Sequence, residues 1–403
     1  MRQENALSVR TGTVRRTVAL LPVRGIPPLS YAPVGAVSQY KGSESMYILA
    51  FESSCDETSA AVLRAEGDSL RVLSDIIASQ VETHRLYGGV VPEIAGRAHI
   101  EAITGITEEA LATAGLTMAD IGLIAVTAHP GLIGALLVAV NFAKSLAASY
   151  GIPLVDVDHI KGHIAAAYLT ETPPSPPFVA LALSGGHTAF YLAKDRVDYH
   201  LLGTTRDDAI GEAYDKIGRI LGIPYPAGAG FDKLATDGFR EATGEERDFY
   251  RRYRRSPAGR DSAMALPSPA LSDGTLDFSF SGLKTAAINL LHRFEATGTE
   301  FSRALFAARY TYEVTEAVAA KAGAALRQNP GCPLVVAGGV AANSHLRRRL
   351  AEVAAQNGVS LHIPPLSLCG DNAAMIGAQG YYEFLAGRRA DSSLNASALD
   401  SIV

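Results

Sequence analysis

One pattern occurs twice in this chain: an apolar strand, a short turn of small and polar residues, and a second strand. The first copy, YILAFESSCDETSAAVL, covers residues 47–63, and the second, FVALALSGGHTAFYLAK, covers residues 178–194. Apolar strands on both sides of a short turn predict a β-hairpin in each copy. Because the same hairpin recurs far along the chain, we expect a duplicated fold with two similar lobes.

The turns of the two hairpins indicate what lies between the lobes. Both turns carry hydroxyl side chains, and the second also contains Gly185 and Gly186. Glycine lets backbone N–H groups approach an anion closely, and hydroxyl groups add further donors. A single SGG turn indicates no more than a turn, but two related turns predict lobes that face one anionic ligand.

The composition limits the class of protein. A length of 403 residues predicts two domains or lobes, and 48% hydrophobic residues with 38 glycines fit an α/β protein. The formal net charge of −5 argues against a general nucleic-acid binder, so an RNA site would have to be a local patch. Three widely spaced cysteines argue against a disulfide framework and favour a cytoplasmic location. We expect no membrane span, because Gly134, Asn141 and Lys144 interrupt the longest apolar run.

The chain divides into four expected segments. Residues 1–45 are arginine-rich and acid-poor, which fits a disordered leader or a start codon assigned too early; an organellar import signal is a minor alternative. Residues 46–176 are expected to form the N-terminal lobe, residues 177–390 the C-terminal lobe, and residues 391–403 a flexible tail. In each lobe, strands that alternate with helices predict a mostly parallel sheet.

Two histidines in the segment HIKGH are candidate metal ligands. His159 and His163 lie four residues apart at the start of an expected helix, which puts both imidazoles on one face. An isolated pair of this kind more often packs or caps than binds metal. Zinc proteases need a glutamate directly after the first histidine, and Ile160 stands there, so a metal here would hold and polarise a ligand. Asp371, in a small-residue turn that opens a helix expected in the second lobe, is the candidate third ligand, and its metal would bridge the lobes.

Nine motifs, in order from about residue 46 to near residue 385, resemble the TsaD family. They are ESSCDETS (52–59), YGGVVPEIAGRAH (87–99), PGLIGALLVA (130–139), DHIKGH (158–163), ALSGGHT (182–188), DDAIGEAYDKIGRILG (207–222), DFSFSGLKT (277–285), AGGVAAN (337–343) and GDNAAMIG (370–377). The resemblance implies a two-lobed actin/Hsp70/sugar-kinase-like fold, with ribonuclease H-like lobes around a nucleotide cleft. It also implies transfer of a threonylcarbamoyl group from threonylcarbamoyl-AMP to N6 of the adenosine next to the anticodon. The tRNAs concerned read codons that begin with adenine, and AMP is released.

The resemblance also implies the site residues and partners. One divalent metal per subunit, Fe2+ or alternatively Zn2+, is expected on His159, His163 and Asp371. TsaB-like and TsaE-like proteins are the expected protein partners. The positions expected to contact the nucleotide and acyl donor are Ala182, Leu183, Ser184, Gly185, Gly186, Asp215, Gly228, Asp232 and Asn343.

Several assignments stay open on sequence alone. Asp232 suits a ribose hydroxyl but could instead cap a helix beginning at Lys233, and Gly228 could be an ordinary turn glycine. The general base has two candidates, His187 and Asp56.

The chain also departs from the usual family pattern. His129 stands where glycine is usual, Lys161 stands where glutamate is common, and the usual RPRW-like C-terminal ending is absent.

Two basic segments are candidates for binding tRNA. Residues 247–260 interleave arginines with Phe249, Tyr250 and Tyr253, and residues 347–349 are three arginines in succession. Arginines neutralise phosphates and aromatic rings stack on unpaired bases, although a solvated charged face is the alternative for both segments. The residues expected to extend this surface are His84, Arg85, Arg97 and His99.

Three other functions compete with tRNA modification. A metalloprotease would need the missing glutamate base. A kinase or carbamoyltransferase of the same fold would not need paired histidine ligands. A non-catalytic nucleotide-binding scaffold would not need an intact ligand set.

Overall fold

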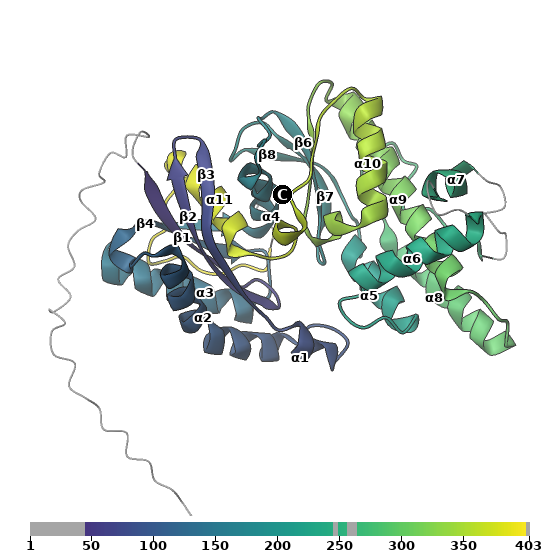
Figure 1. Ribbon diagram of the computed structural model, residues 1–403, viewed down its shortest axis with the longest axis horizontal. Coiled ribbons are helices and arrows are strands. Elements are labelled where there is room, and N and C mark those ends of the chain that lie inside the picture. The colour runs from purple at the N-terminus through teal and green to yellow at the C-terminus, as the bar shows by residue number, and fades with distance from the viewer. Residues whose placement is uncertain (1–44, 245–248, 256–263, 400–403) are drawn as a thin grey trace, which may run out of the picture. The chain divides into compact units, whose positions relative to one another are not determined.

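The structure is a computed structural model that describes residues 45–244, 249–255 and 264–399. Its first lobe is built on a five-stranded sheet with the order β3-β2-β1-β4-β5 (Figure 1). Strands β1, β2 and β3 pair antiparallel, whereas β4 and β5 add on parallel to β1. The strands are β1 (Met46–Glu52), β2 (Glu57–Glu66), β3 (Ser69–Ser79), β4 (Ile121–His129) and β5 (Leu154–Asp158).

The second lobe repeats this sheet. Its order is β10-β9-β6-β7-β8, with β6, β7 and β8 antiparallel and β9 and β10 parallel to β6. The strands are β6 (Phe178–Leu183), β7 (Thr188–Ala193), β8 (Tyr199–Thr204), β9 (Leu334–Ala337) and β10 (Leu361–His362). The duplication predicted from the hairpins is therefore confirmed. The prediction of mostly parallel sheets is wrong, because each hairpin continues into a third antiparallel strand.

Helices cover both sheets. In the first lobe α2 and α3 pack on one face, over a core that includes Leu49, Phe51 and Val126. In the second lobe α5, α6, α8 and α9 contribute to a larger core that is rich in aromatic rings. The helices are α1 (Val81–Arg85), α2 (Pro92–Ala114), α3 (Ile133–Tyr150), α4 (His159–Ala165), α5 (Ile210–Ile220), α6 (Gly228–Thr243), α7 (Phe249–Arg255), α8 (Phe280–Thr297), α9 (Arg303–Gln328), α10 (Ser344–Gln356) and α11 (Ala373–Leu385). Short 3-10 helices are η1 (Met118–Asp120), η2 (Ala166–Leu169), η4 (Gly339–Ala342) and η5 (Leu366–Leu368).

Helix α11 was expected in the second lobe, and this prediction is wrong, because α11 packs mainly against the first sheet. It contacts β1, β2, β4 and β5. A Cβ added to Gly380 would lie 2.5 Å from the Cβ of Ala125, so the helix lies almost directly on the strands. Ala125 alternates with the residues that face α2 and α3, which puts α11 on the opposite face of the sheet. The chain therefore leaves the first lobe after α4 and returns to it near its end.

The segment after α11 also lies on the first lobe. The Ala390 N–H donates to Leu154 O (2.8 Å), and the Ser397 N–H donates to Ala128 O (2.9 Å). Leu394 packs against the first core. The expectation of a flexible tail is therefore wrong for residues 391–399; residues 400–403 and most of the predicted leader lie outside the described residues.

Within the described ranges, α3 is the helix whose length and composition would suffice to cross a membrane. It packs against β4 and α2 and buries Leu136, Ala139 and Val140. Such packing is typical of a helix that covers one face of a sheet.

Candidate metal and nucleotide site

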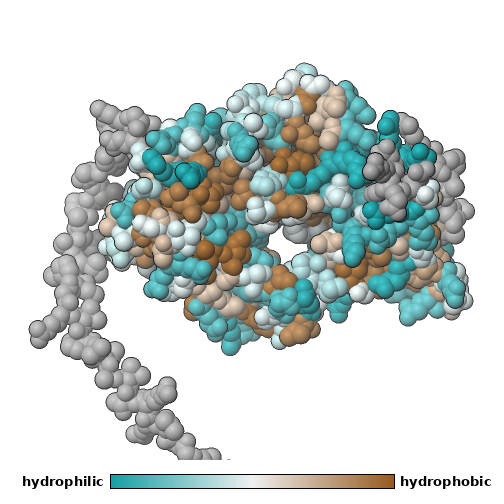
Figure 2. All heavy atoms as spheres, viewed as in Figure 1, coloured by the Kyte–Doolittle hydropathy of each residue, from teal (hydrophilic) through white to brown (hydrophobic). Residues whose placement is uncertain are grey.

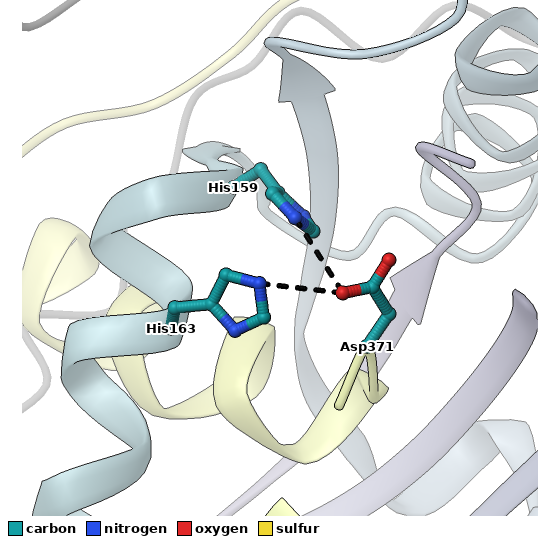
Figure 3. A group of neighbouring side chains, drawn as sticks. All are labelled: His159, His163 and Asp371. Atoms are coloured by element: carbon teal, nitrogen blue, oxygen red, sulfur yellow. Dashed lines mark ion pairs between the residues drawn. The ribbon is translucent and has the colours of Figure 1, made fainter. Parts of the chain in front are cut away.

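Helix α4 begins where β5 ends, and Asp158 fixes this junction. The Asp158 carboxylate accepts hydrogen bonds from the backbone N–H groups of Ile160 (2.8 Å) and Lys161 (3.0 Å). This is N-capping of the helix by a side-chain oxygen. His159 and His163 follow one turn apart, so their imidazoles lie on the same helix face (Figure 3).

Helix α11 brings the third residue of the group to α4. Asn372 caps α11 by accepting a hydrogen bond from the Met375 N–H (2.8 Å), and Asp371 immediately precedes this cap. A Cβ added to Gly162 of α4 would lie 2.6 Å from Cδ1 of Ile376, so the two helices are in close contact. Close helix packing therefore carries Asp371 to the two histidines.

The three side chains converge in the structure. Oδ1 of Asp371 lies 3.6 Å from Nε2 of His159 and 3.3 Å from Nε2 of His163 (Figure 3). One ligand atom from each residue lies within 4.8 Å of the others. Two imidazole nitrogens and one carboxylate oxygen form a donor set that suits zinc, iron or manganese.

The surroundings of His163 fit a bound cation. Its side chain is buried, Nδ1 has no hydrogen-bond partner among the described residues, and Nε2 faces Oδ1 of Asp371 at 3.3 Å. Buried polar atoms normally have partners, and a metal ligand that points at an ion is one explanation of such an exception. The group His159, His163 and Asp371 therefore fits a divalent metal.

A fourth buried residue, Glu52, orients His159 from behind. At the end of β1, Oε2 of Glu52 accepts a hydrogen bond from Nδ1 of His159 (3.0 Å) and another from the Thr127 hydroxyl (2.6 Å). When a metal takes the place of the proton on Nε2, the remaining proton stays on Nδ1 toward Glu52, and the lone pair of Nε2 faces the side of Asp371. A carboxylate behind a metal-bound histidine fixes its tautomer and makes it a better ligand. We did not predict Glu52; a charged residue that ends an apolar strand was the available signal.

The electrostatics of the group favour a positive charge. Burial lowers the pKa of His159, but attraction to Glu52 and Asp371 outweighs it and raises the pKa to about 9. Burial also disfavours the charged forms of Glu52 and Asp371, yet the nearby histidines lower the pKa of both carboxyls. Two carboxylates thus surround the imidazoles, and a cation would balance their charge.

Lys161 and His129 depart from the family pattern. Both contact groups other than the three candidate metal ligands. The Lys161 ammonium donates to Val197 O (3.2 Å) and lies 3.7 Å from Oε1 of Glu383. His129 lies with Nε2 3.7 Å from Oδ2 of Asp158. Neither departure occupies the positions of the candidate ligands.

The SGGH turn of the second lobe forms a compact loop against α5. The Ser184 N–H donates to His187 O (2.9 Å), and the His187 N–H donates to the Ser184 hydroxyl oxygen (3.1 Å). A Cβ on Gly211 would lie 2.7 Å from Ser184 O, so α5 approaches this turn closely. The N–H groups of Gly185 and Gly186 donate to no acceptor among the described residues. They therefore suit an anion. The candidate positions Ala182 and Leu183 are the buried last residues of β6.

The glycine-rich turn after β9 lies beside the SGGH turn. Gly338 has a φ of 93° and packs against the backbone of Leu183, the last residue of β6. A residue with a Cβ would fit neither this conformation nor this contact. Asn343 then caps α10 by accepting from the N–H groups of His345 (3.1 Å) and Leu346 (2.9 Å). Its amide group is left to contact a ligand.

The other candidate nucleotide contacts lie on α5 and α6. Asp215 accepts a hydrogen bond from the Ala227 N–H (2.7 Å), and burial raises its pKa. Asp232 accepts from the Ser344 N–H (3.0 Å) and so joins α6 to α10. The alternative that Asp232 caps a helix beginning at Lys233 is wrong, because α6 begins at Gly228. A Cβ added to Gly228 would meet no atom within 4 Å, so the space beside it is open.

The two candidate bases lie in the turns of the two hairpins. Burial, and then repulsion by His159, lowers the pKa of His187 to about 4, so its imidazole is neutral at pH 7. Asp371 also acts electrostatically on His187, which puts this imidazole near the metal group. Asp56 is 7% exposed and accepts a hydrogen bond from the Tyr225 hydroxyl (3.1 Å). Tyr225 is the second residue that sequence reasoning missed, and no local pattern singled it out.

In the parts of the two basic segments that the structure describes, the tyrosines are buried and two arginines form ion pairs, so these parts differ from the tRNA surface that was expected. Tyr250 and Tyr253 are buried in the second core, so they cannot stack on RNA bases. Arg254 and Arg349 both pair with Glu352, at 2.9 Å and 3.3 Å. Residues 247 and 248, residues 256–260 and the Phe249 and Arg255 side chains lie outside the described residues.

Other candidate tRNA residues also have structural roles. Arg347 donates from Nη2 to Pro364 O (2.9 Å) and from Nε to Ala341 O (2.5 Å), which joins two loops. His84 and His99 are fully buried, so they do not contribute to a surface.

Comparisons with known proteins agree with the motifs. The family model described as TsaD, tRNA N6-adenosine threonylcarbamoyltransferase, matches residues 71–378. A tRNA N6-adenosine threonylcarbamoyltransferase of Clostridium botulinum (strain 657 / Type Ba4) is 45% identical over 353 residues, which are 88% of this chain and 97% of that protein. One of Moorella thermoacetica is 46% identical over 349 residues, covering 87% of this chain and 95% of that protein.

A solved structure supports the fold. HypF from T. kodakarensis superposes with a TM-score of 0.54 at 15% identity, covering 86% of this chain and 48% of that one. This chain thus spans about half the length of HypF, and the likeness concerns the fold alone. Together with the duplicated sheets, it confirms the prediction of a two-lobed actin-like α/β fold.

Proposed function

The chain belongs to the TsaD family of tRNA N6-adenosine threonylcarbamoyltransferases, and we propose that it transfers the threonylcarbamoyl group of threonylcarbamoyl-AMP to tRNA. The acceptor is N6 of the adenosine next to the anticodon, in tRNAs that read codons beginning with adenine, and AMP is released. The observation that carries this proposal is the 45% identity to a relative of that name over 97% of its length.

The reaction sets two tasks for the site. A new bond joins N6 to the carbonyl carbon, and the bond from that carbon to the phosphate oxygen of AMP breaks. The donor carbonyl is already reactive, but the adenine amine is a poor nucleophile, because its lone pair is delocalised into the ring. The protein must therefore position the amine and stabilise charge on the carbonyl and phosphate oxygens.

The chain's own residues suit these tasks. The N–H groups of Gly185 and Gly186 can hold the phosphate of the donor. The carboxylates of Asp215 and Asp232 can each accept from a ribose hydroxyl while keeping their backbone hydrogen bonds. The amide of Asn343 can donate to the base or the ribose.

The nucleophilic amine also loses a proton. The neutral imidazole of His187 can accept it, and the carboxylate of Asp56 is the second candidate. A metal held by His159, His163 and Asp371 would supply Lewis-acid stabilisation of developing negative charge. We propose Fe2+ as this metal, with Zn2+ as the alternative that the donor set also suits.

We propose that the chain works with TsaB-like and TsaE-like proteins and acts in the cytoplasm. The family resemblance supports the partners. The three cysteines, which are all free, support the location. The charge of −5 is consistent with a partner or a local patch contributing to tRNA binding.

The test is a transfer assay with threonylcarbamoyl-AMP labelled in its threonyl carbon and unmodified tRNA. The assay contains the purified chain, with and without the two partner proteins. We expect label in the tRNA, and no label when guanosine replaces the adenosine next to the anticodon. Absence of transfer with all components present, or equal transfer to the guanosine variant, would contradict the proposal. The metalloprotease alternative predicts chelator-sensitive peptide hydrolysis in the same preparation, and we expect none.

A further inference from the structure

The two lobes contact each other directly at Tyr225. This residue lies between α5 and α6 of the second lobe, and its hydroxyl donates to Oδ2 of Asp56 in the first hairpin turn (3.1 Å). From α1 of the first lobe, Nε of Arg85 donates to Tyr225 O (3.1 Å). Side chain and backbone of one residue are therefore both bound by the opposite lobe.

A second contact lies next to this one. The guanidinium of Arg219, at the end of α5, lies 3.3 Å from the position that a Cβ on Gly88 would take. The end of α1 and the α5–α6 loop are thus neighbours on one side of an opening between the lobes (Figures 1 and 2). Tyr225 therefore lies where the two lobes meet on that side.

The charge of Asp56 acts on its neighbour Glu57 and on Asp215, the candidate ribose contact. Burial first, and then the charges of Asp56 and Asp371, raise the pKa of Glu57 to about 9. Burial also raises the pKa of Asp215, and Asp56 is the first charged group that adds to this effect. The charges of Asp56 and Asp371 therefore both act on Glu57, and the charge of Asp56 also acts on Asp215.

Both lobes contact Asp56, and the side chains of Glu57 and Cys55 in the first lobe also hydrogen-bond its carboxylate. The first lobe fixes its backbone, because Asp56 O accepts from the Gln80 N–H (3.0 Å) and Cys55 O accepts from Nε2 of His99 (3.0 Å). The second lobe contacts its carboxylate through the Tyr225 hydroxyl. Burial and the nearby Asp56 raise the pKa of Tyr225, so the hydroxyl keeps its proton and donates.

We propose that Tyr225 is a positioning residue that completes the set of contacts to the Asp56 carboxylate in the reaction cleft while the two lobes are closed. Opening of the cleft to admit the acyl-adenylate or release AMP breaks the hydroxyl–carboxylate hydrogen bond. Closure restores it, so the Asp56 carboxylate has its full set of contacts when the lobes close around a bound donor. This inference rests on the proposed function.

The test is a double-mutant cycle on single-turnover transfer. Tyr225→Phe keeps the ring and removes only the hydroxyl, and Asp56→Ala removes the acceptor. We expect Tyr225→Phe to lower the transfer rate roughly tenfold, with a change of less than about threefold in the KM for threonylcarbamoyl-AMP. In the Asp56→Ala background, Tyr225→Phe should cause no further loss, because the two residues act as one unit. Tyr150→Phe, at an exposed site on α3, is the matched control.

Two results would overturn the inference: an unchanged rate in Tyr225→Phe, or losses that multiply in the double variant. If Tyr225→Phe does not fold, Arg85→Met gives the same test, because this side chain is 42% exposed and its Nε binds Tyr225 O. It should slow transfer in the wild-type background and not in the Asp56→Ala background. A wild-type chain that transfers no label would contradict the proposed function instead, so the two failures are distinguishable.

Discussion

A single residue that hydrogen-bonds a candidate ligand sets the orientation of that ligand in the candidate metal site. Glu52 is fully buried, yet it binds His159 Nδ1 and the Thr127 hydroxyl and thereby sets which imidazole nitrogen faces Asp371. Burying a carboxylate is costly unless it is paired. Here the pairing of Glu52 with His159 and Thr127 offsets that cost and fixes the orientation of His159.

Glu52→Gln should weaken metal binding roughly 10- to 100-fold, because it removes the charge behind His159 and keeps the shape. Competition with a chelator of known affinity measures this effect, and Glu101→Gln on the exposed face of α2 is the control. Equal metal affinity in Glu52→Gln and wild type would show that Glu52 does not support the ligand.

Asp75 should make the stability of the protein depend on pH. It accepts a hydrogen bond from the Ser59 hydroxyl (3.1 Å), whose oxygen accepts from the Ala373 N–H at the start of α11 (2.9 Å). Burial raises the pKa of Asp75 from its ordinary value of 3.8 to about 6. A raised carboxyl pKa favours the protonated form in the folded state, so stability is full below the unfolded value and is lost as pH rises through 6.

Asp75→Asn is neutral at every pH and should therefore avoid this loss. We expect its free energy of unfolding to exceed that of wild type by about 2 to 3 kcal/mol at pH 8, and by less at pH 5. Urea unfolding across this range measures the difference, with the exposed Asp237→Asn as the control. A difference that does not grow with pH would contradict the account.

At the scale of elements, the site depends on how closely α11 approaches its neighbours. Gly380 lets the helix lie against Ala125 of β4, and Gly162 lets α4 lie against Ile376 of α11. These contacts put Asp371 beside the imidazoles. The sequence showed the glycines but not the surfaces they would meet.

Gly380→Ala should destabilise the protein by about 1 to 3 kcal/mol, because the new methyl group would lie 2.5 Å from a strand Cβ that cannot rotate away. Gly105→Ala, on α2, is the matched control, since its added Cβ meets no atom within 4 Å. The control should raise stability by up to about 1 kcal/mol. Thermal unfolding compares them, and a Gly380→Ala variant as stable as Gly105→Ala would contradict this packing.

At the scale of the whole molecule, the features that depend on residues close together in the sequence could be predicted. The repeated hairpins predicted two related lobes, and the spacing of His159 and His163 predicted their shared helix face. The sheet on which α11 packs was not predictable, because its position in the chain does not say which lobe it joins. Tyr250 and Tyr253 were misjudged for a similar reason: a basic helix looks exposed until its aromatic face is seen in the core.

The most direct test of the account joins metal content to transfer. We expect the purified chain to hold about one divalent metal, and transfer to fall roughly 100-fold or more on metal removal and return on its re-addition. His163→Ala should lose both the metal and the activity, whereas the exposed His292→Ala should keep both. Undiminished threonylcarbamoyl transfer by a metal-free chain, or by His163→Ala, would contradict the central claim.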